Sequence, residues 1–221
     1  MTMENDLVFL FDVDNTLIDN DRIQSELTVR LTELFGAEAS NLYWKIFERL
    51  RRDLGYADYL GALEKFRLEK LHDQRVPRMS SWLIDYPFAE RVYEGALNAI
   101  AHVQQWGPAV ILSDGDAVFQ PRKIDRSGLW EAVEGRVLIY VHKEQELSHV
   151  EQLYPAKHYV VIDDKLHILT AIKGIWRERV TTVFPRQGHY AWDTDILANS
   201  LPADIQLDRV SDLNHCALSF V

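Results

Sequence analysis

Five short, mostly apolar runs constrain the fold of this chain more than any other feature of its sequence. They lack the alternation of a half-exposed strand, which is typical of parallel strands buried on both faces of a sheet. The runs are Leu7–Phe11, Ala109–Leu112, Arg136–Val141, Tyr159–Ile162 and Val180–Phe184. Helical patterns over Lys143–Tyr154 and Lys165–Arg179 lie between the later runs. Strands and helices that alternate in this way predict an α/β fold built on a parallel sheet.

The segment between the first two runs is much longer than the crossover of about a dozen residues that two parallel strands require. Its helical patterns extend over Asp21–Phe35, Ser40–Leu54, Tyr56–Leu71 and Arg91–Trp106. Pro77 and Pro87 are expected to break the chain before the last of these helices, which belongs to the crossover. We therefore predict an α/β core over residues 1–18 and 91–221 and an inserted helical domain over residues 19–90.

Composition excludes several classes of partner. The formal net charge of −10 at pH 7 disfavours nucleic acid, which requires a basic surface, and anionic membranes. The apolar runs are shorter than the roughly 18 residues of a membrane span, and the N-terminus lacks the basic segment of a signal peptide. Cys216 is the only cysteine, so no disulfide can form within the chain. We expect a cytoplasmic protein, and the sequence does not indicate its oligomeric state.

Polar clusters follow four of the predicted strands at their carboxyl ends. The clusters are Asp12-Val13-Asp14-Asn15-Thr16, Ser113-Asp114-Gly115-Asp116, His142-Lys143 and Asp163-Asp164-Lys165. Taken singly, each could be a helix cap or a turn, because Asp, Asn, Ser and Gly are common in both. Ligands of open parallel sheets bind outside the carboxyl ends of the strands, so the four clusters together predict one shared site.

The residue types in these clusters suit phosphoryl chemistry. Asp12 and Asp14 can share a face, and with the acidic pair after the fourth strand they crowd anions that a cation would relieve. Carboxylate oxygens are suitable ligands for Mg²⁺. One carboxylate can act as a nucleophile and a second can transfer protons. The hydroxyls of Thr16 and Ser113 and the charge of Lys143 suit the oxygens of a phosphoryl group.

The order of these clusters resembles the motifs of the haloacid dehalogenase-like (HAD) hydrolase superfamily. "FDVDNTL" is similar to the first motif, "VILSDGD" to the second and "VVIDDK" to the acidic fourth, and Lys143 in "YVHKE" falls where the third motif has its lysine. The resemblance implies a Rossmann-like doubly wound core. It also implies that residues 19–90 form the family's helical cap domain, which closes over the substrate.

The same resemblance implies a role for each residue of the site. Asp12 would be the nucleophile and a Mg²⁺ ligand, and Asp14 the general acid/base, with its backbone carbonyl also bound to the metal. Asp164 would be the main metal ligand of the fourth motif, with Asp163 as a direct or water-mediated partner. The residues expected to bind the phosphoryl group are Thr16, Ser113 and Lys143.

Haloacid dehalogenases are similar in pattern but lack the second aspartate of the first motif, which is Asp14 here. We therefore expect a Mg²⁺-dependent phosphoric monoester hydrolase that acts on a small phosphorylated metabolite through an aspartyl-phosphate. Two alternatives stay open: a phosphomutase of the same superfamily, and a non-catalytic regulator that binds phosphate or metal. Lys123 competes with Lys143 for the role of phosphate-binding lysine, but we expect it to be solvated or locally paired. Aromatic residues of the insertion, such as Tyr59, are expected to be core.

Overall fold

The computed structural model describes residues 5–215, so the interpretation of Cys216 lies outside them. Six parallel strands form a sheet in the order β3-β2-β1-β4-β5-β6. The strands are β1 (Asn5–Phe11), β2 (Ala109–Asp114), β3 (Val137–Tyr140), β4 (Ala156–Ile162), β5 (Val180–Pro185) and β6 (Ile205–Leu207). The predicted α/β class with a doubly wound parallel sheet is confirmed.

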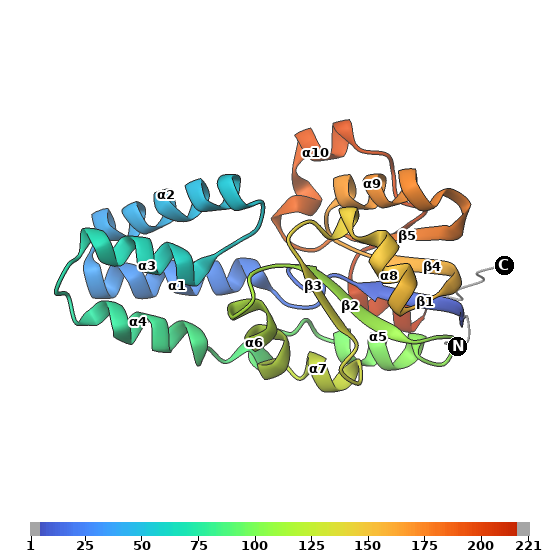
Figure 1. Ribbon diagram of the computed structural model, residues 1–221, viewed down its shortest axis with the longest axis horizontal. Helices are drawn as coiled ribbons and strands as arrows, with labels where there is room; N and C mark the ends of the chain where they lie inside the picture. Colours follow the sequence, from blue (N-terminus) through green and yellow to red (C-terminus); the bar gives the residue numbers. More distant parts are fainter. Residues whose placement is uncertain (1–4, 216–221) are drawn as a thin grey trace.

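Helices join the strands and cover the sheet (Figure 1). The α-helices of residues 5–215 are α1 (Asn20–Phe35), α2 (Ala37–Leu54), α3 (Tyr59–Glu69), α4 (Arg75–Ile84), α5 (Ala96–Val103), α6 (Phe119–Arg126), α7 (Leu129–Ala132), α8 (Leu147–Leu153), α9 (Leu166–Trp176) and α10 (Thr194–Asn199). The 3₁₀ helices are η1 (Phe88–Arg91), η2 (Lys143–Gln145), η3 (Arg177–Arg179), η4 (His189–Trp192) and η5 (Val210–Asn214). None of the helices within the described range combines the length and the apolar character needed to span a membrane.

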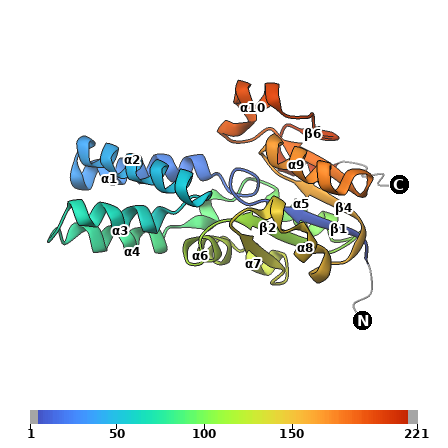
Figure 2. The same ribbon diagram turned by 45° about the horizontal axis from the view of Figure 1, so that its top comes forward.

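The central strand β1 shows how the sheet is buried. Phe9 and Phe11 pack on the face covered by α5, whereas Val8 and Leu10 pack on the face covered by α8 and α9 (Figures 1 and 2). All four side chains are 0% exposed. Burial on both faces is the physical reason why this run is apolar without alternation.

Several predicted elements need correction. The sequence pattern misses β6, because three residues are too few for a recognisable run, and it misses α4, because Pro77 is taken as a break. Pro77 lies in the first turn of α4, where its missing N–H costs no helical hydrogen bond. The helix expected over Arg91–Trp106 is shorter and begins as α5 after Gly95, whose backbone is left-handed. β3 is likewise shorter than the run Arg136–Val141.

Helices α1–α4 form a layer of their own beside the end of the sheet where β1 leads into α1 (Figures 1 and 2). Its interior is aromatic. Tyr43, Phe47 and Tyr59 are each no more than 1% exposed, and the ring centroids of Phe47 and Tyr59 are 4.8 Å apart. The prediction that Tyr59 is core is therefore confirmed. Asp19 caps α1, since its carboxylate accepts a hydrogen bond from the N–H of Arg22.

A charged contact anchors α1 to the segment that returns to the sheet. The Glu26 carboxylate accepts hydrogen bonds from the Tyr86 hydroxyl at 2.6 Å and from Arg91 at 3.0 Å. Burial acts to raise the pKa of Glu26, but the donors Tyr86, Arg22 and Arg91 outweigh it and lower the pKa to about 2. Since the ordinary value is 4.5, this contact stabilises the fold fully above that pH and loses its effect as the pH falls toward 2.

We expect Glu26→Gln to lower the free energy of unfolding at pH 6 by about 1 kcal/mol, a value discounted because the carboxylate is partly exposed to solvent. Urea unfolding measured from pH 6 down to pH 3 should show the difference from wild type shrinking. Glu33→Gln is the matched control, because Glu33 is 61% exposed and pairs only loosely with Arg30. A Glu26→Gln difference that grows in acid would contradict the proposed contact.

Candidate functional site

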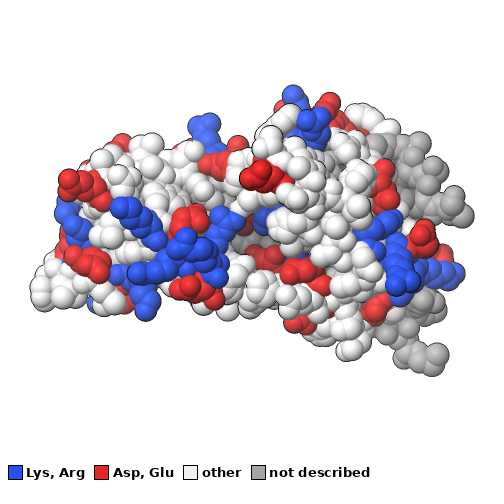
Figure 3. Space-filling view, turned by 90° about the horizontal axis from the view of Figure 1, so that it is seen from above, with Lys and Arg blue, Asp and Glu red and all other residues white. Residues whose placement is uncertain are grey.

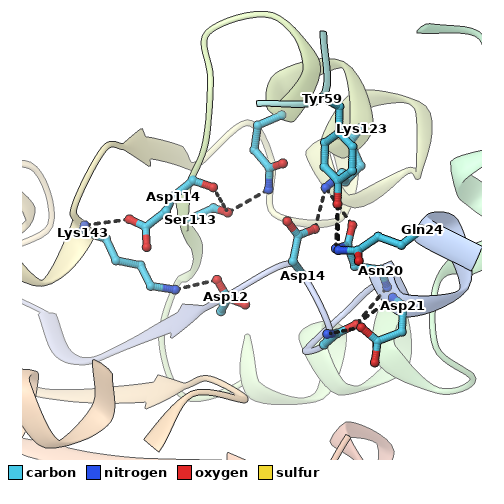
Figure 4. A network of polar contacts seen from close by, with 12 residues as sticks. Asp12, Asp14, Asn20, Asp21, Gln24, Tyr59, Ser113, Asp114, Lys123 and Lys143 are labelled. Carbon is cyan, nitrogen blue, oxygen red and sulfur yellow. Dashed lines mark hydrogen bonds and ion pairs between the residues drawn. The ribbon is translucent and has the colours of Figure 1, made fainter. Parts of the chain in front are cut away.

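Four predicted polar clusters converge at the carboxyl ends of the strands, and Figure 4 shows Asp12, Ser113 and Lys143 from three of them. Asp12 follows β1 directly, and Asp163 and Asp164 follow β4, the hydrogen-bonded neighbour of β1. Ser113 lies near the carboxyl end of β2, where β2 pairs with β3, and Lys143 follows β3. Parallel pairing therefore places residues that are far apart in sequence at one edge of the sheet.

Lys143 lies at the centre of the site. Its Nζ is 2.5 Å from Oδ1 of Asp12 and 2.6 Å from Oδ2 of Asp163. Its backbone N–H donates to Oδ1 of Asp114 at 2.7 Å, which fixes the loop that carries it (Figure 4). Lys143 is 1% exposed. The structure thus brings this lysine to Asp12, where the sequence pattern places it.

The charged groups of the site shift one another's pKa. Burial raises the pKa of Asp163, against the effect of the nearby Lys143 ammonium. Burial also raises the pKa of Asp164 well above its usual value, against the effect of the Lys165 ammonium, and the carboxylates of Asp12 and Asp163 act in the same direction as burial. Burial disfavours the charged forms of Lys143 and Lys165, but the surrounding carboxylates outweigh it and raise the pKa of both. Burial is therefore the leading cause of the raised pKa of both Asp163 and Asp164.

The carboxylate cluster fits a divalent cation. Asp12, Asp163 and Asp164 each offer one oxygen, these oxygens lie within 4.8 Å of one another, and all three residues are buried. Oδ2 of Asp12 and both carboxylate oxygens of Asp164 are buried and accept no hydrogen bond from residues 5–215. Such oxygens are costly unless they are protonated or bound to a cation. A donor set made only of hard oxygens is the kind that Mg²⁺ and Ca²⁺ prefer.

The loop after β1 is held by its own polar side chains. Asn15 has a φ of 61°, a left-handed conformation that Asn tolerates, and its Oδ1 accepts hydrogen bonds from the N–H groups of Asn20 and Asp21. Thr16 is fully buried, and its hydroxyl accepts a hydrogen bond from the N–H of Asp164 at 3.0 Å. Thr16 therefore ties this loop to the loop after β4. Its binding to substrate stays a prediction.

Ser113 is fixed by α6. Its Oγ accepts a hydrogen bond from Nε2 of Gln120 at 2.9 Å, and both residues are buried. Asp116 accepts hydrogen bonds from the N–H groups of Val118 and Phe119, so it closes the turn before α6. Asp116 therefore has the turn-forming role that the sequence leaves open for Asp residues of these clusters.

Asp14 is held by a lysine that the sequence pattern does not assign to the site. Nζ of Lys123, on α6, lies 2.6 Å from Oδ1 of Asp14 (Figure 4). Lys123 is 0% exposed, whereas the side chain of Asp14 is 20% exposed. The prediction that Lys123 is solvated or locally paired is wrong, because α6 turns this side chain inward to a partner far away in the sequence.

Two contacts join helix α2 and its C-cap to the sheet-bearing part of the molecule. Arg51 donates a hydrogen bond to the hydroxyl of Tyr190. Gly55, the left-handed C-cap of α2, packs so closely on His142 that a Cβ there would lie 2.2 Å from Cε1 of the ring. Figure 3 shows Asp and Glu side chains where the two parts of the molecule meet, with Lys and Arg side chains beside them on the helical layer. The site thus lies against the helical layer.

Lys123 and Lys165, which have no role of their own in the motif pattern, carry a signal in the sequence. The buried face of α6 consists of Phe119, Gln120, Lys123 and Ile124. Two polar residues thus occupy positions where helical spacing leads one to expect apolar ones, which marks them as partners of other buried polar groups. Lys165 directly follows the acidic pair of the fourth cluster. The nearby carboxylates, including both members of that pair, raise the pKa of Lys165 despite its burial.

Comparison with solved structures shows which proteins share this arrangement. A structure from Burkholderia xenovorans LB400, described as a haloacid dehalogenase-like hydrolase, is 58% identical, with 98% of each chain covered and a TM-score of 0.93. L-2-haloacid dehalogenase from Xanthobacter autotrophicus is 15% identical, with 96% of this chain and 98% of its own covered and a TM-score of 0.61. The HAD-hydrolase YfnB from Bacillus subtilis, bound to magnesium, is 14% identical with the same coverage and a TM-score of 0.59. No family model and no curated protein matches the chain.

The two distant similarities show a common fold and nothing more. The similarity to the Burkholderia protein is of another kind, because it extends over nearly the whole of both chains at an identity of 58%. The strand order and the positions of Asp12, Ser113, Lys143 and Asp164 at the strand ends agree with the motif order of the sequence. The chain therefore belongs to the haloacid dehalogenase-like hydrolase family.

Proposed function

We propose that this hydrolase cleaves phosphoric monoesters with Mg²⁺, through an aspartyl-phosphate formed on Asp12. The observation that carries the proposal is Asp14, a partly exposed carboxyl group two residues beyond Asp12 (Figure 4). An alkoxide that leaves phosphorus needs a proton, and a positioned carboxyl group can supply it. A halide leaves without a proton, so a dehalogenase has no use for an acid at this position.

The proposed reaction has two steps. An oxygen of Asp12 attacks phosphorus, the bond between phosphorus and the ester oxygen breaks, and Asp14 gives its proton to that oxygen. Water then attacks the phosphorus of the aspartyl-phosphate, Asp14 takes a proton from the water, and the bond between phosphorus and Asp12 breaks. Lys123 holds Oδ1 of Asp14, so Oδ2 is the atom that carries the proton. The products are the alcohol and inorganic phosphate.

Mg²⁺ is the proposed cofactor. Asp12 and Asp164 would hold it, with Asp163 as a direct or water-mediated partner and the backbone carbonyl of Asp14 as a further ligand. The buried oxygens of Asp12 and Asp164 that lack donors support this choice. When bound, Mg²⁺ supplies electrostatic stabilisation of the charge on the phosphoryl oxygens. Lys143, held between two carboxylates, contributes positive charge beside the nucleophile.

The substrate is proposed to be a small phosphorylated molecule, and the groups without a role in the chemical steps are assigned to its binding. Helices α1–α4, within residues 19–90, are proposed as the cap that covers its leaving group. Several basic residues lie between the middle and the C-terminal end of α2: Lys45, Arg49, Arg51 and Arg52. An anionic substrate would therefore meet a local positive field on a chain whose net charge is −10. The side chains proposed to bind the phosphoryl group are Thr16, Ser113 and Lys143.

Phosphate release from a panel of sugar phosphates, nucleotides and short-chain phosphates tests this function. We expect release with Mg²⁺, a fall of about two orders of magnitude or more after treatment with EDTA, and recovery when Mg²⁺ is returned in excess. In parallel reactions, 2-chloropropionate should release no chloride. Chloride release would favour a dehalogenase, and turnover that EDTA leaves unchanged would contradict the role of the metal.

The two other candidate functions give different results in the same experiments. A phosphomutase would move phosphate between positions of a sugar phosphate, which a coupled assay detects, and would release little inorganic phosphate. A non-catalytic regulator would bind Mg²⁺ or phosphate in calorimetry and would turn over none of the esters. Either result would replace the proposed hydrolase.

A further inference from the structure

Lys123 is a buried charge that takes no direct part in the proposed reaction. It is 0% exposed, and the other described lysine of comparable burial, Lys143, is already paired with Asp12 and Asp163. A buried ammonium is costly unless it is paired and hydrogen-bonded. Lys123 is both, since its Nζ lies 2.6 Å from Oδ1 of Asp14 and 3.3 Å from Oδ1 of Asn20.

The contacts of Lys123 continue into the helical layer. Asn20, the first residue of α1, donates through Nδ2 to the hydroxyl of Tyr59 at 3.1 Å, and Gln24 donates to the same hydroxyl at 3.0 Å (Figure 4). Nζ of Lys123 also lies 5.8 Å from the centre of the Tyr59 ring. A chain of polar contacts therefore runs from Asp14, beside the nucleophile, through α6 and α1 to α3.

Lys123 lies behind Asp14 and not beside the substrate. Its side chain is fully buried while that of Asp14 is 20% exposed, so a phosphoryl group would meet the carboxylate and not the ammonium. Oδ1 of Asp14 is occupied by Lys123, whereas Oδ2 has no hydrogen-bond partner among residues 5–215. The pair thus fixes which oxygen of Asp14 remains available.

We propose that Lys123 is a positioning residue that holds the Asp14 carboxyl group at the angle required for proton transfer, and that Asn20 and Tyr59 couple this position to helices α1 and α3. The inference rests on the proposed function, because it takes Asp14 as the group that protonates the leaving oxygen. A proton donor is effective only within hydrogen-bond reach of its acceptor, so a carboxyl group freed from its anchor protonates the leaving oxygen less often.

Two esters that differ in leaving group test the proposal. An alkyl phosphate needs a proton on its leaving oxygen, whereas 2,4-dinitrophenyl phosphate departs as a stable phenolate. The value of kcat/KM reports steps up to formation of the phosphoenzyme. We expect Lys123→Met to lower kcat/KM by about 10- to 100-fold for the alkyl ester and by less than about threefold for the dinitrophenyl ester. Lys123→Arg should recover part of the loss.

Double substitution gives a second readout that a merely structural role would not produce. If Lys123 acts through Asp14, adding Lys123→Met to Asp14→Asn should cause no further loss with the alkyl ester. Independent effects would multiply instead. Thermal unfolding of each variant shows whether it is folded at the assay temperature.

Tyr59→Phe keeps the test valid if Lys123→Met does not fold. It removes only the hydroxyl that accepts from Asn20 and Gln24, and we expect the same preference for the good leaving group with a smaller loss, about two- to tenfold. Tyr43→Phe is the matched control, since its buried hydroxyl donates to the backbone of Tyr59 and does not contact Asn20. Tyr43→Phe should affect both esters equally.

The outcomes separate this inference from the proposed function. An active wild-type protein whose Lys123→Met and Tyr59→Phe variants lose both esters equally, or whose double variant with Asp14→Asn loses more than Asp14→Asn alone, overturns the role of Lys123 only. A wild-type protein that hydrolyses neither ester with Mg²⁺ overturns the proposed function, and the role of Lys123 with it.

Discussion

Asp12→Asn is expected to abolish phosphate release, with a fall in kcat of about four orders of magnitude or more. An amide oxygen is a poor nucleophile and does not form the aspartyl-phosphate, so the reaction loses its first step. The variant also removes one negative charge from the cluster of three buried carboxylates. We therefore expect it to fold, and thermal unfolding should show this. Single-turnover assays with trapping of labelled phosphoenzyme measure the loss directly.

Asp6→Asn is the matched control for this substitution. Asp6 lies at the opposite end of β1 from Asp12, its side chain is 83% exposed, and it pairs with Lys157 at the surface. The same chemical change there should leave kcat within about twofold of wild type, because an exposed ion pair contributes little. A second variant, Asp12→Ala, guards against slow deamidation of Asn back to Asp. Residual turnover above one part in about a hundred in Asp12→Ala would rule out a nucleophilic role for Asp12.

The residues in the strands and directly after them could be predicted, because the burial that determines their positions is visible in the neighbouring sequence. A run such as Leu7–Phe11 is apolar because both faces of the sheet cover it, and that burial is visible in the sequence. Parallel strands then bring Asp12 to Asp163 without further information, since both follow directly on paired strands. The pairing of Lys143 with both carboxylates follows the same logic.

The partners of Lys123 could not be predicted in the same way, because its burial depends on tertiary packing. From its sequence alone, a lysine on a short helix is expected to be solvated, because the elements that pack over that helix are unknown. The two groups that accept from Lys123 lie in the loop after β1 and at the start of α1. Only the packing of Phe119 and Tyr59 around it, with their ring centroids 5.1 Å apart, shows that the charge is enclosed. The missed helix α4 is a different case, because Pro77 misleads only when its place in the turn is unknown.

Lys143→Met is expected to cause the largest loss of stability among single substitutions at the site, about 3–5 kcal/mol in the absence of Mg²⁺. Lys143 is 1% exposed and pairs with two carboxylates that are themselves no more than 4% exposed. Removing it leaves buried negative charge without a partner, which is the costly way to break a buried ion pair. Urea unfolding gives the free energy, and the thermal midpoint should fall by about 10 °C.

Lys157→Met provides the control, because Lys157 is 67% exposed and its ion pair with Asp6 at the surface contributes little to stability. The double variant Lys143→Met with Asp163→Asn should be more stable than Lys143→Met alone, since it also removes one of the two buried carboxylate charges that lose their partner. Mg²⁺ should restore part of the stability of Lys143→Met if Asp12 and Asp164 bind it, because a cation bound to the folded state shifts unfolding by mass action. Equal losses in Lys143→Met and Lys157→Met would mean that the carboxylates at the end of β1 and β4 are hydrated or protonated. Neither the nucleophile nor the metal site could then be as proposed.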